Sequence, residues 1–274
     1  MRRIAFVCLK GGVGKTVTTT AVAVGLARRG KRVLVIDADQ QSNATWTLSG
    51  GQEADAPTLA AVLTRQAAAI EAIRPTPTPG VDLLPADGSL GAVNVQLAQE
   101  LGRDTRLRSA METADAPYDA VLIDTAPQFT TILANVLVYA SEVIVPVDAG
   151  LYAMLGLVEL QGVVDEVREV YRNDALRISG LVLTRTSRNN VSRDVETELR
   201  ARFGERVFKA TIPQSSKVEE AVTNGRTVMT HAPKSAAALA YDQLIEEILS
   251  NGGIDAQVGS GVKAVRRPRK DHAA

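Results

Sequence analysis

The chain has 274 residues, a length that predicts one or two domains when ~150 residues are allowed for each. Its 31 lysines and arginines balance its 31 aspartates and glutamates, and 45% of its residues are hydrophobic. This composition excludes a disordered chain and a protein that coats nucleic acid through a high overall positive charge. The single cysteine, Cys8, excludes a disulfide framework and a thiolate-held zinc or iron–sulfur cluster within one chain, and is typical of a cytoplasmic protein.

Apolar runs and helical patterns alternate along the chain. The runs predicted as buried strands are residues 4–9, 32–37, 81–85, 119–124, 142–147, 178–184 and 207–212. Helical patterns lie at residues 16–29, 59–73, 90–114, 156–171, 192–203 and 236–249. This alternation predicts an α/β fold, a three-layer sandwich whose mostly parallel central sheet is covered by helices on both faces. The most apolar stretch, 136–147, contains Ser141 and Glu142, so we expect no membrane span.

We expect residues 1–251 to form a single domain. Within it, residues 50–80 form a divergent insertion that ends in the Pro-rich connection 75–80. Residues 252–274 combine glycines with five lysines and arginines, which predicts a flexible basic tail. The positively charged N-terminus precedes an apolar run too short for a signal peptide, and we expect no helix-turn-helix domain before the first strand.

The strongest local pattern is the run KGGVGKT at residues 10–16, between the first strand and the first helix. Its glycines let backbone N–H groups converge on phosphate oxygens, and the helix start adds partial positive charge. The Lys15 ammonium can reach the outer phosphates, and the Thr16 hydroxyl can ligate Mg²⁺. An ordinary Gly-rich turn is the structural alternative. The predicted phosphate-binding residues are Lys10, Gly11, Gly12, Val13, Gly14, Lys15, Thr16 and Val17.

Aspartates end two of the predicted strands. Asp37 and Asp39 follow the second strand, and Asp124 ends the run DAVLID. Ligands bind at the carboxyl ends of parallel strands, so we expect Mg²⁺ to be held by Thr16, Asp39 and Asp124. A single aspartate at a strand end can equally cap a turn.

KGGVGKT resembles the deviant Walker A motif of the ParA/MinD ATPases, whose defining feature is the lysine at position 10 here. Residues 35–45 resemble the family's switch I segment, with Gln40 in place of the usual proline, and residues 124–128 resemble switch II. The resemblance covers about residues 1–250 and implies a P-loop NTPase that hydrolyses ATP with Mg²⁺. It implies a homodimer with two ATP molecules between the subunits, in which Lys10 contacts the nucleotide of the other subunit. The implied catalytic residues are Lys10, Lys15 and Asp39, the last positioning the attacking water.

The segment FKATIPQSSKVEEA, residues 208–221, resembles the part of the family that lies against the adenine. This resemblance implies that Ile212, Pro213 and Gln214 contact the base. Thr184 and Arg185 are further candidates for that contact.

The resemblance is greatest to the small ParA-type partition ATPases and implies binding to non-specific DNA, a ParB-like partner that stimulates hydrolysis, and a cytoplasmic, nucleoid-associated protein. The implied DNA-binding residues are Arg188, Arg193 and Lys217, although each could be an ordinary surface residue. The basic tail lacks bulky apolar residues and so suits phosphates better than acyl chains, unless it only aids solubility. We therefore expect no membrane partner. The alternatives are a membrane-associated MinD-like positioning ATPase and a metabolic P-loop ligase or kinase.

Overall fold

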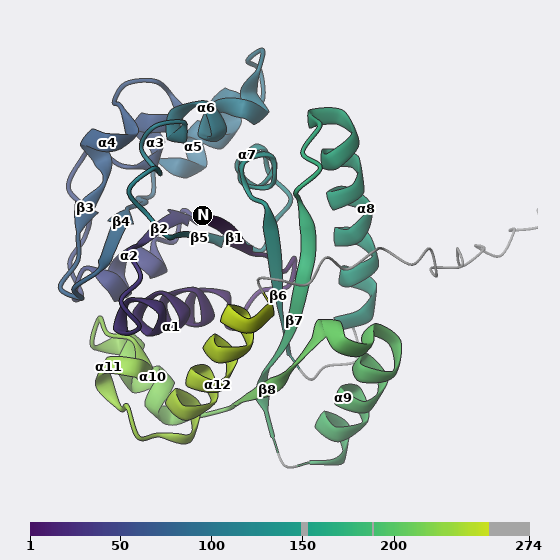
Figure 1. The fold of residues 1–274 in the computed structure, drawn as a ribbon. Helices are drawn as coiled ribbons and strands as arrows, with labels where there is room; N and C mark the ends of the chain where they lie inside the picture. Colours follow the sequence, from purple (N-terminus) through teal and green to yellow (C-terminus); the bar gives the residue numbers. More distant parts are fainter. Residues whose placement is uncertain (149–152, 188, 252–274) are drawn as a thin grey trace, which may run out of the picture.

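The computed structural model describes residues 1–148, 153–187 and 189–251, and its centre is a single sheet in the order β3-β4-β2-β5-β1-β6-β7-β8 (Figure 1). All neighbouring strands run parallel except the short β3, which pairs antiparallel with β4. The strands are β1 (Arg2–Phe6), β2 (Val33–Ala38), β3 (Arg74–Pro75), β4 (Val81–Leu84), β5 (Ala120–Thr125), β6 (Glu142–Asp148), β7 (Arg177–Thr186) and β8 (Val207–Pro213). The predicted mostly parallel sheet is confirmed.

Helices cover both faces of the sheet and form two separate cores with it. One face carries α1 (Lys15–Arg28), α10 (Ser216–Thr223), α11 (Val228–His231) and α12 (Ala236–Ser250). The other carries α3 (Leu59–Leu63), α4 (Ala69–Ala72), α5 (Leu90–Leu97), α6 (Arg106–Met111), α7 (Thr131–Tyr139), α8 (Ala153–Tyr171) and α9 (Asn190–Phe203). The short α2 (Asn43–Leu48) packs beside α1, and 3-10 turns occupy Arg103–Thr105 and Gly204–Arg206. The predicted three-layer sandwich is thus confirmed.

Strand β2 shows why the sequence reads as continuous apolar runs. Successive side chains of a strand point to opposite faces, and here both faces are buried. Leu34 and Ile36 enter the core beneath α3 to α9, whereas Val33 and Val35 enter the core beneath α1 and α12. The strand therefore carries apolar residues on both faces as far as Ile36, and the buried Asp37 that follows is hydrogen-bonded to Thr45.

Several predicted helices differ from the observed ones. The pattern at 90–114 is broken into α5 and α6, because Gly102 takes a left-handed backbone with φ 67° that no helix accommodates. The pattern at 59–73 is divided into α3 and α4, with Arg65 at φ 62° between them. The prediction of one helix in each place was wrong.

Helix α7 is present although it was not predicted. It lies within an apolar stretch that continues into β6, so helical periodicity is masked. The local signal is its N-cap, where the Thr130 hydroxyl accepts a hydrogen bond from the Leu133 N–H at 3.2 Å. The short helices α2, α10 and α11 were also not predicted.

The parallel strands bring their carboxyl ends to one edge of the sheet. In the register of β2, β5 and β1, Asp124 lies beside both Asp37 and Phe6. The segments that follow β1, β2, β5, β7 and β8 therefore converge at this edge, which carries most of the predicted site residues that the structure describes.

Candidate nucleotide-binding site

The glycine-rich loop between β1 and α1 has the backbone that its sequence predicts. Gly12 and Gly14 have φ values of 73° and 84°, which glycine adopts without steric cost. The Lys15 side chain is 7% exposed, and its Nζ donates to the Lys10 carbonyl oxygen at 3.2 Å. Burial lowers the pKa of Lys15, and the nearby Cys8 and Asp124 act in the opposite direction. The Lys15 ammonium is thus held at the loop, where phosphate oxygens of a bound nucleotide would accept its remaining hydrogen bonds.

Asp124 at the end of β5 lies directly beneath this loop. Its carboxylate is fully buried and accepts from the Thr16 hydroxyl at 2.7 Å and from the Thr19 hydroxyl at 3.3 Å. Burial, together with the charge of Asp37, raises the pKa of Asp124 to about 8. A hydroxyl, a carboxylate and the neighbouring Asp39 are all oxygen donors of the kind Mg²⁺ prefers, so the residues present fit this cation. Burial raises the pKa of Asp124 and of Asp37, and a bound cation would favour their ionised form.

Asp39 lies on the loop between β2 and α2 and is 8% exposed. Its Oδ1 accepts from the Gln41 N–H at 2.9 Å, and its carbonyl oxygen accepts from the Ser42 N–H at 3.0 Å. Gln40 stands where the family has proline, yet these hydrogen bonds close the turn without it. The Asp39 side chain borders the same cavity as the glycine-rich loop.

Asp37 has a structural role that the sequence analysis did not assign. Its carboxylate is fully buried; Oδ2 accepts from both the N–H and the hydroxyl of Thr45 at 2.7 Å, and Oδ1 accepts from the Asp39 N–H at 3.2 Å. Burial raises the pKa of Asp37 to about 6, against the effect of the Thr45 hydrogen bonds. Asp37 thus fixes both the switch I loop and the start of α2.

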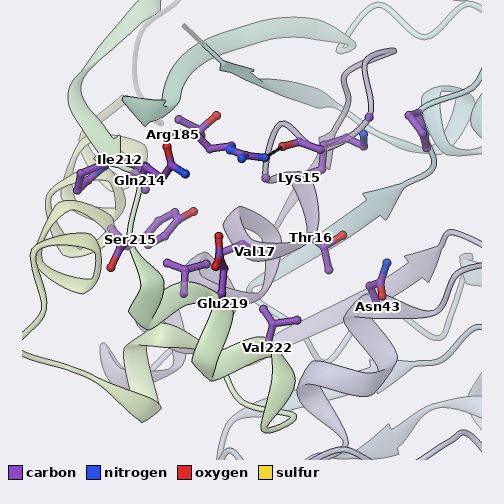
Figure 2. Close-up of a pocket in the computed structure, with 18 of the residues that line it drawn as sticks. Lys15, Thr16, Val17, Asn43, Arg185, Ile212, Gln214, Ser215, Glu219 and Val222 are labelled. Carbon is purple, nitrogen blue, oxygen red and sulfur yellow. Dashed lines mark hydrogen bonds between the residues drawn. The ribbon is translucent and has the colours of Figure 1, made fainter. Parts of the chain in front are cut away.

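A cavity of about 610 Å³ opens at the carboxyl edge of the sheet, between the glycine-rich loop, the switch I loop and the segment after β8 (Figure 2). Lys15, Thr16 and Asp39 line its loop end. The β8–α10 end is mixed, with the apolar Ile212, Pro213, Val218 and Val222 beside the polar Gln214, Ser215 and Glu219. The sequence-predicted residues that line it are Gly11, Gly12, Gly14, Lys15, Thr16, Val17, Asp39, Thr184, Arg185, Ile212, Pro213 and Gln214. The structure therefore brings the predicted phosphate and adenine residues around one space.

Three predicted residues lie elsewhere. Val13 is buried, and its carbonyl oxygen accepts from the Thr184 hydroxyl at 2.7 Å. Asp124 lies beneath Thr16 rather than at the cavity wall. Lys10 points to the other side of the loop, where its Nζ meets Asp148 Oδ2 at 2.5 Å beside a smaller cavity of about 280 Å³.

Part of the cavity wall was not predicted. Helix α10 supplies much of it, because the chain turns directly from β8 into this helix. The signal that could have revealed α10 is Ser215 before the helical run, and its hydroxyl does accept from the Lys217 N–H at 3.2 Å. The lining residues missed from the sequence are Gln41, Asn43, Pro127, Ser215, Val218, Glu219, Val222, Thr223 and Tyr241.

Arg185 closes the cavity on the β7 side. It has a left-handed φ of 52°, an uncommon conformation for a residue with a side chain. Its Nη1 donates to the Gly12 carbonyl oxygen at 2.9 Å, the hydrogen bond drawn in Figure 2. The strained residue thus ties the end of β7 to the glycine-rich loop.

The predicted DNA-binding residues are only partly described. Arg188 lies outside the described residues, as does the basic tail, 252–274. Arg193 is exposed in the first turn of α9, and Lys217 is exposed in the first turn of α10. Because these helices follow the parallel strands β7 and β8, both residues lie at the edge of the sheet that carries the cavity. The Lys217 ammonium contacts Glu220 at 2.7 Å, so its charge is partly compensated.

None of the helices in the described part of the chain has the length and apolar character needed to cross a membrane.

The chain is similar to a known family model and to proteins named for chromosome partitioning. The model of the AAA domain family matches residues 1–178. The chromosome partitioning protein ParA of Caulobacter vibrioides is 38% identical over 253 residues, 91% of this chain and 94% of that protein. The chromosome-partitioning ATPase Soj of Thermus thermophilus is 40% identical over 251 residues, 91% of this chain and 96% of that protein.

A solved structure has the same fold. Cobyrinic acid a,c-diamide synthase from Mycobacterium smegmatis, solved with a bound ATP analogue and magnesium, has a TM-score of 0.78 and 28% sequence identity, covering 91% of this chain and 94% of that one. The deviant Walker A loop, the carboxylates behind it and the two partitioning relatives all indicate the same family. The chain therefore belongs to the ParA/MinD family of deviant Walker A ATPases and, within it, to the ParA/Soj group.

Proposed function

We propose that this chain is a DNA-partition ATPase in which ATP binding assembles a homodimer that binds non-specific DNA. The observation that carries the proposal is the cavity that joins the glycine-rich loop, Asp39 and the β8–α10 wall around space for a nucleotide. In this proposal the triphosphate lies on the loop beside Lys15, and the base lies against Ile212, Pro213 and Gln214. The identity of 38–40% to proteins named for chromosome partitioning supports the biological role.

In this proposal, residues at the glycine-rich loop and on the loop after β2 carry out the hydrolytic step. Lys15 binds the outer phosphate oxygens and stabilises the charge that develops on them during transfer to water. The Asp39 carboxylate orients the attacking water, and Thr16 and Asp124 hold Mg²⁺, which supplies further positive charge to the phosphates when bound. The Gln41 N–H donates to Asp39 Oδ1 and so contributes to the orientation of this carboxylate.

Lys10 supports the dimeric part of the proposal. Its side chain is 47% exposed on the side of the loop away from the cavity wall, so within one chain it has no place at the phosphates described above. In a dimer it would reach the polyphosphate bound by the second copy, where charge-assisted hydrogen bonds are strong. Nucleotide state would then decide whether the two copies remain together.

In the cell, the ATP dimer is proposed to be cytoplasmic and nucleoid-associated, with a ParB-like partner stimulating hydrolysis and release. Exposed Arg193 and Lys217 lie at the same edge as the cavity, which supports coupling between nucleotide and DNA. The test is a native gel with DNA in ATP, ADP and no nucleotide, repeated across a salt series. Retardation with ATP alone, weakened by salt, is the expected result; equal retardation in all three states would refute the nucleotide switch.

A metabolic ligase is the second candidate, because the structural neighbour at 28% identity is named a synthase. Such an enzyme would require an acceptor for turnover. Hydrolysis that needs no small-molecule acceptor and increases with DNA would favour the partition ATPase.

A further inference from the structure

Trp46, the single tryptophan of the chain, connects the switch I helix α2 to the wall of the nucleotide cavity. Its indole is 39% exposed, so it is not a core side chain, and its Nε1 donates to the Val222 carbonyl oxygen of α10 at 3.0 Å. The Val222 side chain lines the cavity, as Figure 2 shows. One residue of α10 therefore contacts both the proposed adenosine space and the tryptophan.

The hydrogen bond lies at the C-terminal end of α10, where carbonyl groups lack donors from their own helix. The Val222 carbonyl oxygen accepts from the Gly225 N–H at 3.0 Å as well as from Trp46. Trp46 therefore acts as a side-chain cap of α10, supplied by a segment 176 residues away in sequence.

Backbone packing keeps the two helices together at this point. Gly225 has φ 60°, and a Cβ added there would lie 2.2 Å from the backbone nitrogen of Gly51. The Gly51 N–H in turn donates to the Trp46 carbonyl oxygen at 2.9 Å. We name this contact the α2–α10 clasp: Trp46 and Gly51 on one side, and Val222 and Gly225 on the other.

On its other side, helix α2 is hydrogen-bonded to the carboxylate of Asp37, which lies beside Asp39. Thr45, the neighbour of Trp46 on α2, donates its N–H and hydroxyl to Asp37, and Asp37 accepts from the Asp39 N–H. Thr45 and Asp37 are almost completely buried, so water competes little for these hydrogen bonds. Two sets of hydrogen bonds, joined through the covalent link between Thr45 and Trp46, therefore connect the α10 wall with the backbone of Asp39.

We infer that Trp46 is a positioning residue that makes the placement of Asp39 depend on α10, the helix against which the adenosine would pack. The inference rests on the proposed function, in which Asp39 orients the attacking water. With the clasp intact, a filled adenosine space holds α10, and α10 holds α2 and the switch I loop. Loss of the indole N–H leaves the cavity wall in place but frees switch I, so the rate of hydrolysis falls while ATP affinity is nearly unchanged.

The test removes the N–H donor alone. Because Trp46 is the only tryptophan, growth of an auxotroph on benzothienylalanine replaces one N–H in the whole chain by sulfur and retains the ring shape. Single-turnover ATP hydrolysis is then measured against ATP concentration, with Trp46→Phe as a second variant. We expect the maximal rate to fall about five-fold, which corresponds to one ordinary hydrogen bond, and the half-saturating ATP concentration to change much less.

The matched control is Thr47→Val, which removes a hydroxyl hydrogen bond from Thr47 Oγ1 to the Asn43 carbonyl oxygen, 2.8 Å long and internal to α2. It should leave the rate unchanged. An unchanged rate in the benzothienylalanine protein, a rise in half-saturating ATP with the rate unaffected, or an equal loss in Thr47→Val would overturn the inference.

The path is tested by a double-mutant cycle. Thr45→Val should lower the rate by itself, and adding Trp46→Phe should lower it no further; additive losses would refute the route through Asp37. Asp39→Ala is assayed in parallel. If Asp39→Ala abolishes hydrolysis while the Trp46 variants match the wild type, only the role of Trp46 is wrong. If Asp39→Ala hydrolyses ATP normally, the assignment of Asp39 in the proposed function is wrong.

Discussion

The ion pair of Lys10 with Asp148 predicts that Asp148→Asn strengthens ATP-dependent dimerisation. In the single chain, Lys10 Nζ lies 2.5 Å from Asp148 Oδ2, with side-chain exposures of 47% and 26%. Lys10 cannot hold this partner and also reach the nucleotide of a second copy. Formation of the proposed dimer would therefore break one such pair in each protomer, and replacement of the carboxylate by an amide would remove the attraction that has to be broken.

The size of the effect follows from the exposure of the pair. Partly exposed ion pairs contribute ~0.2–1 kcal/mol after screening by solvent. Two of them lost per dimer change the free energy of association by ~0.4–2 kcal/mol, so the dimer dissociation constant should fall by roughly two- to thirty-fold. The effect should diminish as salt is raised, because exposed charges are screened.

The assay is analytical ultracentrifugation across a concentration series with Mg²⁺ and a non-hydrolysable ATP analogue. Glu159→Gln is the matched control: it removes a carboxylate at the rim of the same small cavity and leaves the Lys10–Asp148 pair in place. Lys10→Ala should prevent dimerisation, with or without Asp148→Asn. A dissociation constant for Asp148→Asn that equals or exceeds that of the wild type would show that the pair does not compete with the dimer.

Three further predictions concern pH, backbone packing and DNA. Burial and the charge of Asp37 raise the pKa of Asp124 in the metal-free chain to about 8, from an ordinary value of 3.8, so between these pH values the folded state binds a proton that the unfolded state releases. The free energy of unfolding should therefore fall as pH rises from ~4 through 8. Asp124→Asn should raise the melting temperature of the metal-free protein at pH ~8.5 but not at pH ~4. Gly225→Ala should lower the free energy of unfolding, measured by urea denaturation, by ~1–3 kcal/mol, because φ is positive at this position and the new Cβ would meet the backbone of Gly51. A denaturation midpoint equal to that of the wild type would contradict the packing described. Glu220→Gln frees Lys217 from its 2.7 Å ion pair and should tighten DNA binding and steepen the logarithmic salt dependence by up to about one unit, whereas an unchanged slope in fluorescence anisotropy would exclude Lys217 from the phosphate contacts.

Residues 10–16 show what sequence alone can determine. The loop conformation depends on glycines at Gly12 and Gly14, on the strand before them and on the helix after them, all of which are neighbours in the chain. Alternating apolar runs and helical patterns likewise determine a parallel sheet with two covered faces, because each strand must supply apolar residues to both. The fold class and the conformation of the glycine-rich loop were therefore predictable.

The tertiary structure decided which distant segments meet at that end of the sheet. Apolar patterns do not encode the strand order β2-β5-β1-β6-β7-β8, yet this order brings Asp37 beside Asp124 and Asp148 beside the loop that carries Lys10. The clasp of Trp46 with Val222 spans 176 residues and depends on two glycine turns that only the folded chain brings together. Local backbone preferences act over a few residues, whereas these contacts arise only once burial of both faces of the sheet has determined how the elements pack.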